Sequence, residues 1–151
     1  MGCIFSINIS DAKGVSKKPV NEAKLIEGIG IQGDAHSGTP LREVSLLSIE
    51  SIKKQKECIK VKKPDFSLSA GDFAENITTE GLDLSKLKIG LKLKIKKDII
   101  LEITKIGKEC HRYCSIYYKI GNCIMPKEGI FAKVIKGGII KKGDKIEVLN
   151  D

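Results

Sequence analysis

Short segments in which apolar and polar residues alternate recur along the whole chain. A period of two is typical of β-strands that bury one face, and short apolar runs between turn residues are typical of fully buried strands. The segments of either kind are Cys3–Ile9, Ala23–Gly30, Glu43–Leu47, Phe73–Thr78, Leu87–Ile95, Ile99–Ile106, Ile130–Ile135 and Ile139–Leu149. Many short strands at this spacing predict a mainly β protein with a closed or sandwiched sheet.

The residues between these segments predict loops and one helix. Ser10–Val20 and Gly30–Pro40 carry the glycine, proline and aspartate that are typical of loops and turns. A helix is expected from about Ile49 to Glu57, because the serine before it can accept a hydrogen bond from free backbone N–H groups. No internal repeat or linker divides the chain, so residues 1–151 are predicted to form a single domain.

The chain is strongly basic, with 27 basic and 19 acidic residues and a net charge of +8. Such a surface attracts small anions such as phosphates. Aromatic residues make up only 5% of the chain, which provides few stacking platforms for single strands, so nucleic acid is not the expected partner. No apolar run reaches the ~20 residues that span a bilayer, and no secretory signal pattern is present. Together with an odd count of five cysteines, this predicts a reduced, cytoplasmic protein without a membrane partner.

Three of the five cysteines lie within fourteen positions, which makes this segment the densest group of reactive residues. Cys110, Cys114 and Cys123 are accompanied there by His111. Thiolates are the nucleophiles of sulfur chemistry and also soft metal ligands. The group could therefore hold a transferable sulfur as a persulfide, or bind a metal directly.

Basic residues surround these thiols, among them Lys108 and Arg112. Positive charge nearby lowers the pKa of a thiol and raises its thiolate fraction at neutral pH. Two other interpretations stay open. Zinc could use the three cysteines and His111 as four ligands, although no second C-x-x-C pair supports this. Cys114 and Cys123 could instead be small buried hydrophobic residues on strands.

A glycine-bearing loop is the second candidate site. It runs Gly33-Asp34-Ala35-His36-Ser37-Gly38 and is followed by Arg42. Its backbone N–H groups could face an anion, Arg42 could donate two hydrogen bonds to a phosphate, and Asp34 and His36 could orient a ligand or transfer a proton. The structural alternative is a loop in which Asp34 caps its own backbone. Asn76, in a polar stretch that leaves a strand, is a third candidate that could line a pocket.

Taken together, these segments resemble the MOSC family, which is named for the C-terminal domain of molybdenum cofactor sulfurases. The order of the stretches carries the resemblance, because each one alone is unspecific. They are Gly33–Gly38 with Arg42–Leu47, Glu75–Gly81, Leu101–Thr104, Gly107–His111 with Cys114, Cys123–Pro126 with Glu128–Ala132, Gly137-Gly138 and Gly143-Asp144. They span nearly the whole chain.

The resemblance implies a closed β-barrel-like fold with a few short helices. It also implies a role in the metabolism of the molybdenum cofactor, which is built on molybdopterin. Family members carry sulfur on a cysteine or bind the cofactor with a cysteine near molybdenum. Cys114 matches the family's key cysteine best, with one extra residue between Arg112 and Cys114. Cys110 is the alternative, because its Gly-Lys-Glu-Cys-His context resembles the small bacterial members, and Cys123 is a further thiol that could ligate the metal.

The resulting hypothesis is a sulfur carrier that depends on other proteins. The chain has no room for a desulfurase domain, so no pyridoxal phosphate site is expected and a partner cysteine desulfurase would load Cys114 or Cys110. Molybdoenzymes or molybdopterin-synthesis proteins are the other expected partners. The expected cofactor-binding residues are Gly33, Asp34, His36, Arg42, Asn76, Lys108 and Arg112. Two alternatives stay open: a non-catalytic carrier that delivers the finished cofactor, and a zinc-stabilised basic barrel that binds nucleic acid.

Overall fold

The computed structural model describes residues 2–12, 15–54, 70–71, 73–107 and 129–149. Eleven strands and one 3-10 helix fall within these residues, and a short helix covers residues 49–54. The strands are β1 (Gly2–Ile9), β2 (Lys18–Val20), β3 (Glu22–Ile26), β4 (Gly30–Ile31), β5 (Val44–Ser48), β6 (Ile77–Glu80), β7 (Lys92–Ile95), β8 (Ile99–Ile106), β9 (Ile130–Lys136), β10 (Gly138–Lys141) and β11 (Lys145–Leu149). The 3-10 helix η1 covers Leu84–Lys86. The protein is mainly β, as its alternating pattern predicts.

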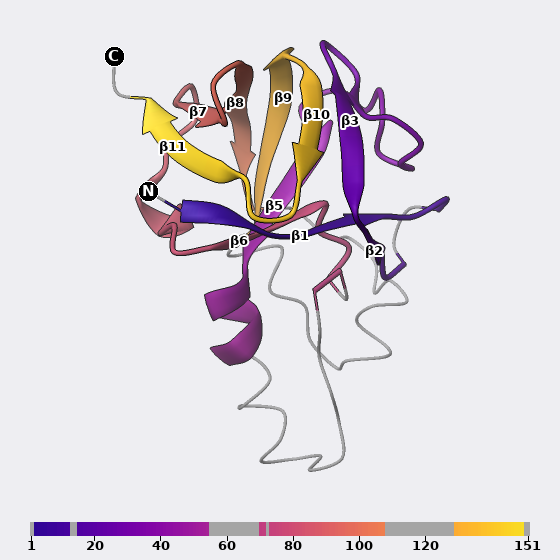
Figure 1. Ribbon diagram of the computed structural model, residues 1–151, viewed down its shortest axis with the longest axis horizontal. Coiled ribbons are helices and arrows are strands. Elements are labelled where there is room, and N and C mark those ends of the chain that lie inside the picture. The colour runs from indigo at the N-terminus through magenta and orange to yellow at the C-terminus, as the bar shows by residue number, and fades with distance from the viewer. Residues whose placement is uncertain (1, 13–14, 55–69, 72, 108–128, 150–151) are drawn as a thin grey trace.

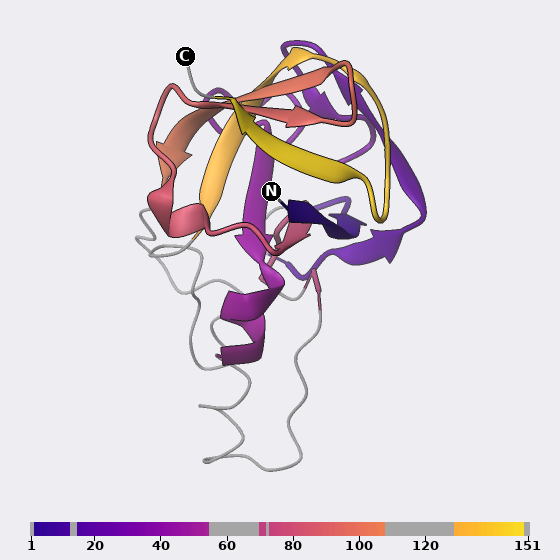
Figure 2. The same cartoon turned by 60° about the vertical axis from the view of Figure 1, so that its left-hand side comes forward.

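Seven of the strands form a closed barrel. They pair in the order β11-β7-β8-β9-β5-β6-β1, and the pairing of β1 with β11 closes the ring. The closing register places Gly2 opposite Ile146 and Cys3 opposite Lys145. β2 pairs antiparallel with the end of β1, Ile7–Ile9, beyond the residues of β1 that pair with β11. The two views show the strands curving round a common interior, with the short helix projecting from one end (Figures 1 and 2).

A second sheet of three strands covers part of the barrel. Its order is β10-β3-β4, and both of its pairings are antiparallel. Leu25, Ile31 and Ile140 from these strands are fully buried in the same hydrophobic cluster as the barrel strands. The two sheets therefore share one core.

The core shows the alternation that the sequence predicts. On the paired strands β7 and β8, Leu93, Ile95, Leu101 and Ile103 are buried, while the residues between them are partly exposed. Burying an aliphatic side chain of this size contributes about 1.5–3 kcal/mol each. Lys92 and Lys94 of β7 alternate with these buried residues and lie on the outer face.

The barrel contains one parallel pair among the described strands, β5 with β6. A parallel pair needs a crossover connection, and the helix over residues 49–54 begins the crossover here. The parallel arrangement brings the starts of β5 and β6 to the same end of the barrel. No helix in the described ranges is long and apolar enough to cross a bilayer.

Several strand boundaries differ from the sequence-based prediction. β2 lies within the predicted loop Ser10–Val20, and Pro19 fits there because β2 is an edge strand. β6 begins at Ile77 instead of Phe73, because Ala74 takes a positive φ of 64° and the preceding residues form turns. The helix starts at residue 49 as expected, and residues 55–57 lie outside the described ranges.

Candidate functional site

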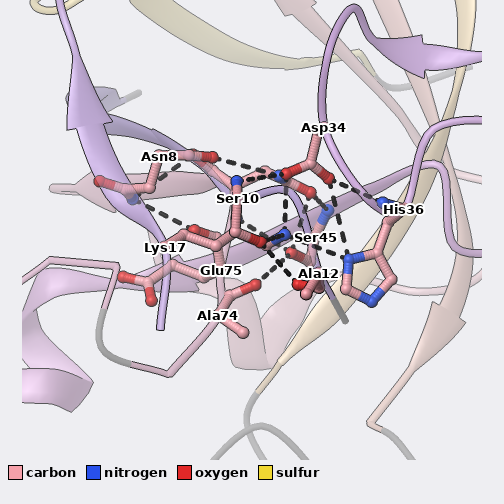
Figure 3. Close-up of polar contacts among 10 residues, drawn as sticks. Asn8, Ser10, Ala12, Lys17, Asp34, His36, Ser45, Ala74 and Glu75 are labelled. Atoms are coloured by element: carbon pink, nitrogen blue, oxygen red, sulfur yellow. Dashed lines mark hydrogen bonds and ion pairs between the residues drawn. The ribbon is translucent and has the colours of Figure 1, made fainter. Parts of the chain in front are cut away.

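A cluster of buried polar side chains lies where β1 ends and where β5 and β6 begin (Figure 3). Polar groups of this kind are seldom buried unless they are paired. Its members are the half-buried Ser10 and the buried Asn8, Lys17, Asp34, His36, Ser45, Glu75 and Asn76. The loops after β1 and β4 bring Ser10, Lys17, Asp34 and His36 to it. Asn8 lies on β1 and Ser45 on β5, and Glu75 and Asn76 directly precede β6. It is the largest group of buried polar side chains in the described part of the chain.

Lys17 and Asp34 form an ion pair at the centre of the cluster. Lys17 Nζ lies 2.8 Å from Asp34 Oδ1, and both side chains are 0% exposed. The backbone N–H of Ser10 also donates to Asp34 Oδ1, at 3.1 Å. The backbone of Lys17 is itself held, since its N–H donates to the carbonyl of Gly71 at 2.7 Å. The pair thus joins the loops after β1 and β4 to the segment before β6.

Asp34 is ionised at neutral pH. Burial alone would raise the pKa of its carboxyl group, but hydrogen bonds from the Lys17 ammonium and from the backbone N–H of His36 outweigh burial and hold the pKa well below its usual range. The ammonium group of Lys17 balances the resulting charge. The centre of the cluster is therefore a rigid pair of opposite charges with no net charge.

His36 lies between this pair and the surface. Its Nδ1 is 3.2 Å from Lys17 Nζ and 3.8 Å from Asp34 Oδ2, and its backbone N–H donates to Asp34 Oδ2 at 3.0 Å. The side chain is 11% exposed. Figure 3 shows Nδ1 directed at the cluster and the opposite ring nitrogen, Nε2, directed away from it. His36 can therefore contact a ligand on one edge while the other edge stays fixed.

The backbone of the glycine-bearing loop is not arranged as we expect for an anion site. Each N–H from residue 34 to residue 39 already donates to an oxygen of the chain; the acceptors belong to Ile31, Ser10, Asp34 (twice), Ile29 and His36. Asp34 does cap its own loop, as the structural alternative predicts. Gly33 takes a positive φ of 87°, which fits a turn residue. An anion at residues 34–39 would therefore have to be bound by side chains.

Arg42 follows the loop and is half-buried. Its guanidinium carbon lies 5.7 Å from the centre of the Phe131 ring, a cation–π contact. Arg42 forms no salt bridge with a described residue, so its charge is available to an anion. The structure does not bring it into direct contact with the Lys17–Asp34 pair.

Asn76 connects two strands and a loop. Its Oδ1 accepts from the N–H and the hydroxyl of Ser45, at 3.0 Å and 3.1 Å, and its Nδ2 donates to the carbonyl of Asn8 at 3.2 Å. All of these contacts are internal. They indicate that Asn76 supports the cluster by connecting Ser45 on β5 to Asn8 on β1.

Glu75 lies deeper in the cluster and is 0% exposed. Burial raises its pKa to about 7, although the Gly71 N–H and the Thr78 hydroxyl donate to its Oε2 at 2.9 Å and 2.7 Å. Its Oε1 has no hydrogen-bond partner among the described residues. Glu75 is thus a buried carboxyl group that gains and loses a proton near neutral pH.

The position of the predicted cysteine site relative to this cluster is not described by the structure. Cys110, His111, Cys114 and Cys123, with Lys108 and Arg112, all lie in residues 108–128, outside the described ranges. Within those ranges no group of three or more histidine, cysteine or acidic side chains is placed to hold a metal ion. Cys3, on β1, is a free and half-buried thiol. The persulfide, metal and zinc interpretations of the cysteine segment stay predictions.

Lys17 is the main residue of the cluster that the sequence did not single out, and Ser10, Asn8 and Ser45 are others. Lys17 stands beside Lys18 in a lysine-rich chain, and Lys18 is exposed while Lys17 is buried. No local pattern distinguishes the two. Only the fold, which carries this loop across the end of the barrel, shows which lysine is paired.

Comparisons with known proteins give a family from a sequence model and a fold from solved structures. The family model of the MOSC domain matches residues 33–147. YuaD from Bacillus subtilis has a similar structure, with a TM-score of 0.74 and 22% sequence identity over 97% of this chain and 94% of that chain. YiiM from Geobacillus stearothermophilus has a TM-score of 0.74 and 17% identity, over 99% of this chain and 76% of that one. No curated protein matches the chain.

Proposed function

Because the chain belongs to the MOSC domain family, we propose that it carries sulfur for the molybdenum cofactor. The observation that carries this proposal is the extent of the family match. It runs from Gly33 to Glu147, and it includes both the loop of Asp34 and His36 and the segment with three cysteines. The family is associated with proteins of molybdenum cofactor metabolism.

The proposed sulfur carrier is Cys114, with Cys110 as the alternative. Its thiolate attacks the outer sulfur of a persulfide on a partner cysteine desulfurase, the sulfur–sulfur bond of the partner breaks, and the partner's thiolate leaves. Lys108, Arg112 and His111 are near these thiols in the sequence, and positive charge there would keep the carrier ionised. The persulfide then holds the sulfur until an acceptor takes it.

The described residues fit a phosphate-bearing cofactor through side chains. Nε2 of His36 and the guanidinium of Arg42 are the groups of the loop region that are not committed to other polar groups of the described chain, and both suit a phosphate oxygen. A net charge of +8 adds a general attraction for anions. When bound, the cofactor supplies a metal for which sulfur is a good ligand, and the thiols of Cys114 and Cys123 are the ligands that this chain would offer.

The proposal is tested by intact-protein mass spectrometry after incubation with a cysteine desulfurase and free cysteine. We expect the wild type to gain one sulfur atom, about 32 Da. Cys114→Ser or Cys110→Ser should abolish the gain. Cys3→Ser is the matched control, since Cys3 lies on β1 of the barrel and its replacement should leave the gain unchanged.

The absence of a sulfur adduct on the wild-type protein would contradict the sulfur-carrier proposal. Binding of purified molybdenum cofactor would then be measured directly. Stoichiometric binding without sulfur loading would identify a non-catalytic cofactor carrier. Absence of both would contradict the role in molybdenum cofactor metabolism altogether.

A further inference from the structure

We propose that Lys17 is a positioning residue: its ammonium group fixes His36 in the tautomer that carries the ring proton on Nε2. The histidine then presents an uncharged N–H donor to a ligand oxygen. The tautomer follows from the geometry of the protein alone. Only the identity of the ligand oxygen, a phosphate oxygen of the cofactor, rests on the proposed function.

The hydrogen-bonding capacity of Lys17 carries the first step. An ammonium group has three N–H donors and no acceptor. Lys17 Nζ has three polar neighbours within hydrogen-bond distance, namely Asp34 Oδ1 at 2.8 Å, Ser10 Oγ at 3.0 Å and His36 Nδ1 at 3.2 Å. Each N–H therefore has one acceptor, and no donor is left over in this buried position.

The second step concerns the ring of His36. Because Lys17 can only donate, Nδ1 must be the acceptor of their shared hydrogen bond, and an accepting Nδ1 carries no proton. The proton of the neutral ring is then on Nε2. A proton on Nδ1 would place two donors against each other at 3.2 Å, inside a cluster where both Lys17 and Asp34 are fully buried.

The third step is the role of Asp34. Its carboxylate neutralises Lys17, so the ammonium can stay charged in a buried position. Its Oδ2 accepts from the backbone of His36 and lies only 3.8 Å from Nδ1. If Lys17 were absent, Nδ1 could take the proton and donate towards Oδ2. Lys17 therefore decides between two tautomers that the site could otherwise adopt.

The result is that the uncharged Nε2–H of His36 is offered to a ligand next to the Lys17–Asp34 ion pair, which has no net charge. Nε2 points away from the cluster and donates to no described residue (Figure 3). Such a donor orients a ligand oxygen more than it raises affinity, because a hydrogen bond from a neutral group is weaker than one from a cation. Arg42 is then the charged group that would contribute affinity at this loop.

Nitrogen-15 NMR of the histidine rings tests the inference on the full chain. The chain has two histidines, so a His111→Gln variant assigns the signals of His36. We expect the wild type to show a protonated Nε2 and an unprotonated Nδ1. Lys17→Met should shift the proton to Nδ1, whereas Lys17→Arg, which keeps a cationic donor, should restore the wild-type pattern. Ser10→Ala is the matched control, because it removes a neighbour of the ammonium but not the contact with His36.

A protonated Nδ1 in the wild type would overturn the inference, and so would an unchanged tautomer in a folded Lys17→Met protein. If Lys17→Met does not fold, the wild-type spectrum and Lys17→Arg still decide the question. Inorganic phosphate is then added as a probe of the ligand. A shift of the Nε2 signal would support phosphate docking here. No shift, with the Nε2–H tautomer present, would contradict the docking part of the proposed function while the role of Lys17 stands.

Discussion

Two buried acidic residues, Asp34 and Glu75, have pKa values that their surroundings shift in opposite directions. Asp34 has a cation and several donors around it, so its pKa falls and it stays ionised. Glu75 has two donors but no ion pair with a described cation, and burial raises its pKa to about 7. Within one cluster, Asp34 therefore stays ionised at neutral pH, whereas Glu75 changes its charge near pH 7.

The raised pKa of Glu75 predicts that the protein loses stability as the pH rises. Folded Glu75 holds its proton up to about pH 7, whereas the unfolded chain releases it near the ordinary value of 4.5. The folded state therefore binds more protons between these values, and the stabilisation present below pH 4.5 is lost as the pH passes 7. The shift corresponds to roughly 3 kcal/mol at ~1.4 kcal/mol per pKa unit.

The Glu75→Gln variant isolates this effect, because a glutamine cannot ionise. Urea denaturation of both proteins is measured at several pH values from about 5 to about 8. The free energy of unfolding should fall less over this range in Glu75→Gln than in the wild type. Glu27→Gln, at an exposed position in a turn, is the control and should keep the wild-type slope. Equal slopes for wild type and Glu75→Gln would mean that Glu75 titrates normally in the folded protein.

At the scale of elements, the period-two pattern predicts strands best where both neighbours are also strands. β8 has the predicted bounds, Ile99–Ile106, and its side chains alternate between buried and partly exposed from Ile99 to Thr104. β2 was missed because three residues with a proline show no period, and its pairing with β1 comes from the barrel. The start of β6 was placed too early, because Phe73 is buried without being in a strand.

The candidate site could be predicted from the sequence only in part, for a similar reason. Asp34 and His36 stand in a recognisable loop, and they do meet in the structure. Lys17, which is 17 residues from Asp34 along the chain, joins them through the fold alone. Asn76 was expected near a pocket, but its hydrogen bonds show that it links strands. Long-range partners of this kind leave no local pattern.

The close approach of Gly71 to the Lys17 segment leads to a second prediction. A Cβ at Gly71 would lie 2.2 Å from the Lys17 carbonyl oxygen, and the residue has a positive φ of 90°. Gly71→Ala should therefore cost more than the about 1–2 kcal/mol of a left-handed residue alone, and should displace Lys17. Thermal unfolding and the His36 NMR signal measure the two effects.

Gly90→Ala is the control for backbone strain. Gly90 also has a positive φ, 94°, but a Cβ there would meet nothing within 4 Å. If both variants lost the same stability, the contact between Gly71 and Lys17 would contribute nothing beyond strain.

At the scale of the whole molecule, stability depends on the seam where the barrel closes. Ile146 lies on β11 between β1 and β7, and it is 0% exposed. Ile146→Ala should lower the free energy of unfolding by about 2–5 kcal/mol, because it removes buried methylene groups and leaves a cavity. Chemical denaturation measures the loss. Ile139→Ala, on β10 of the second sheet and 47% exposed, should lose less than about 1 kcal/mol. A similar loss in both variants would argue against a packed seam.

The pairing of β1 with β11 also has a consequence for synthesis on the ribosome. Gly2 and its partner Ile146 lie far apart in the sequence, so the ring cannot close until the ribosome has released the whole stretch between them. Until then β1 has an edge without its final partner, and such an edge can pair with another chain. Contacts this distant in sequence also form slowly. The nascent chain is therefore expected to depend most on chaperones while β1 is already made and β11 is not yet available to pair with it.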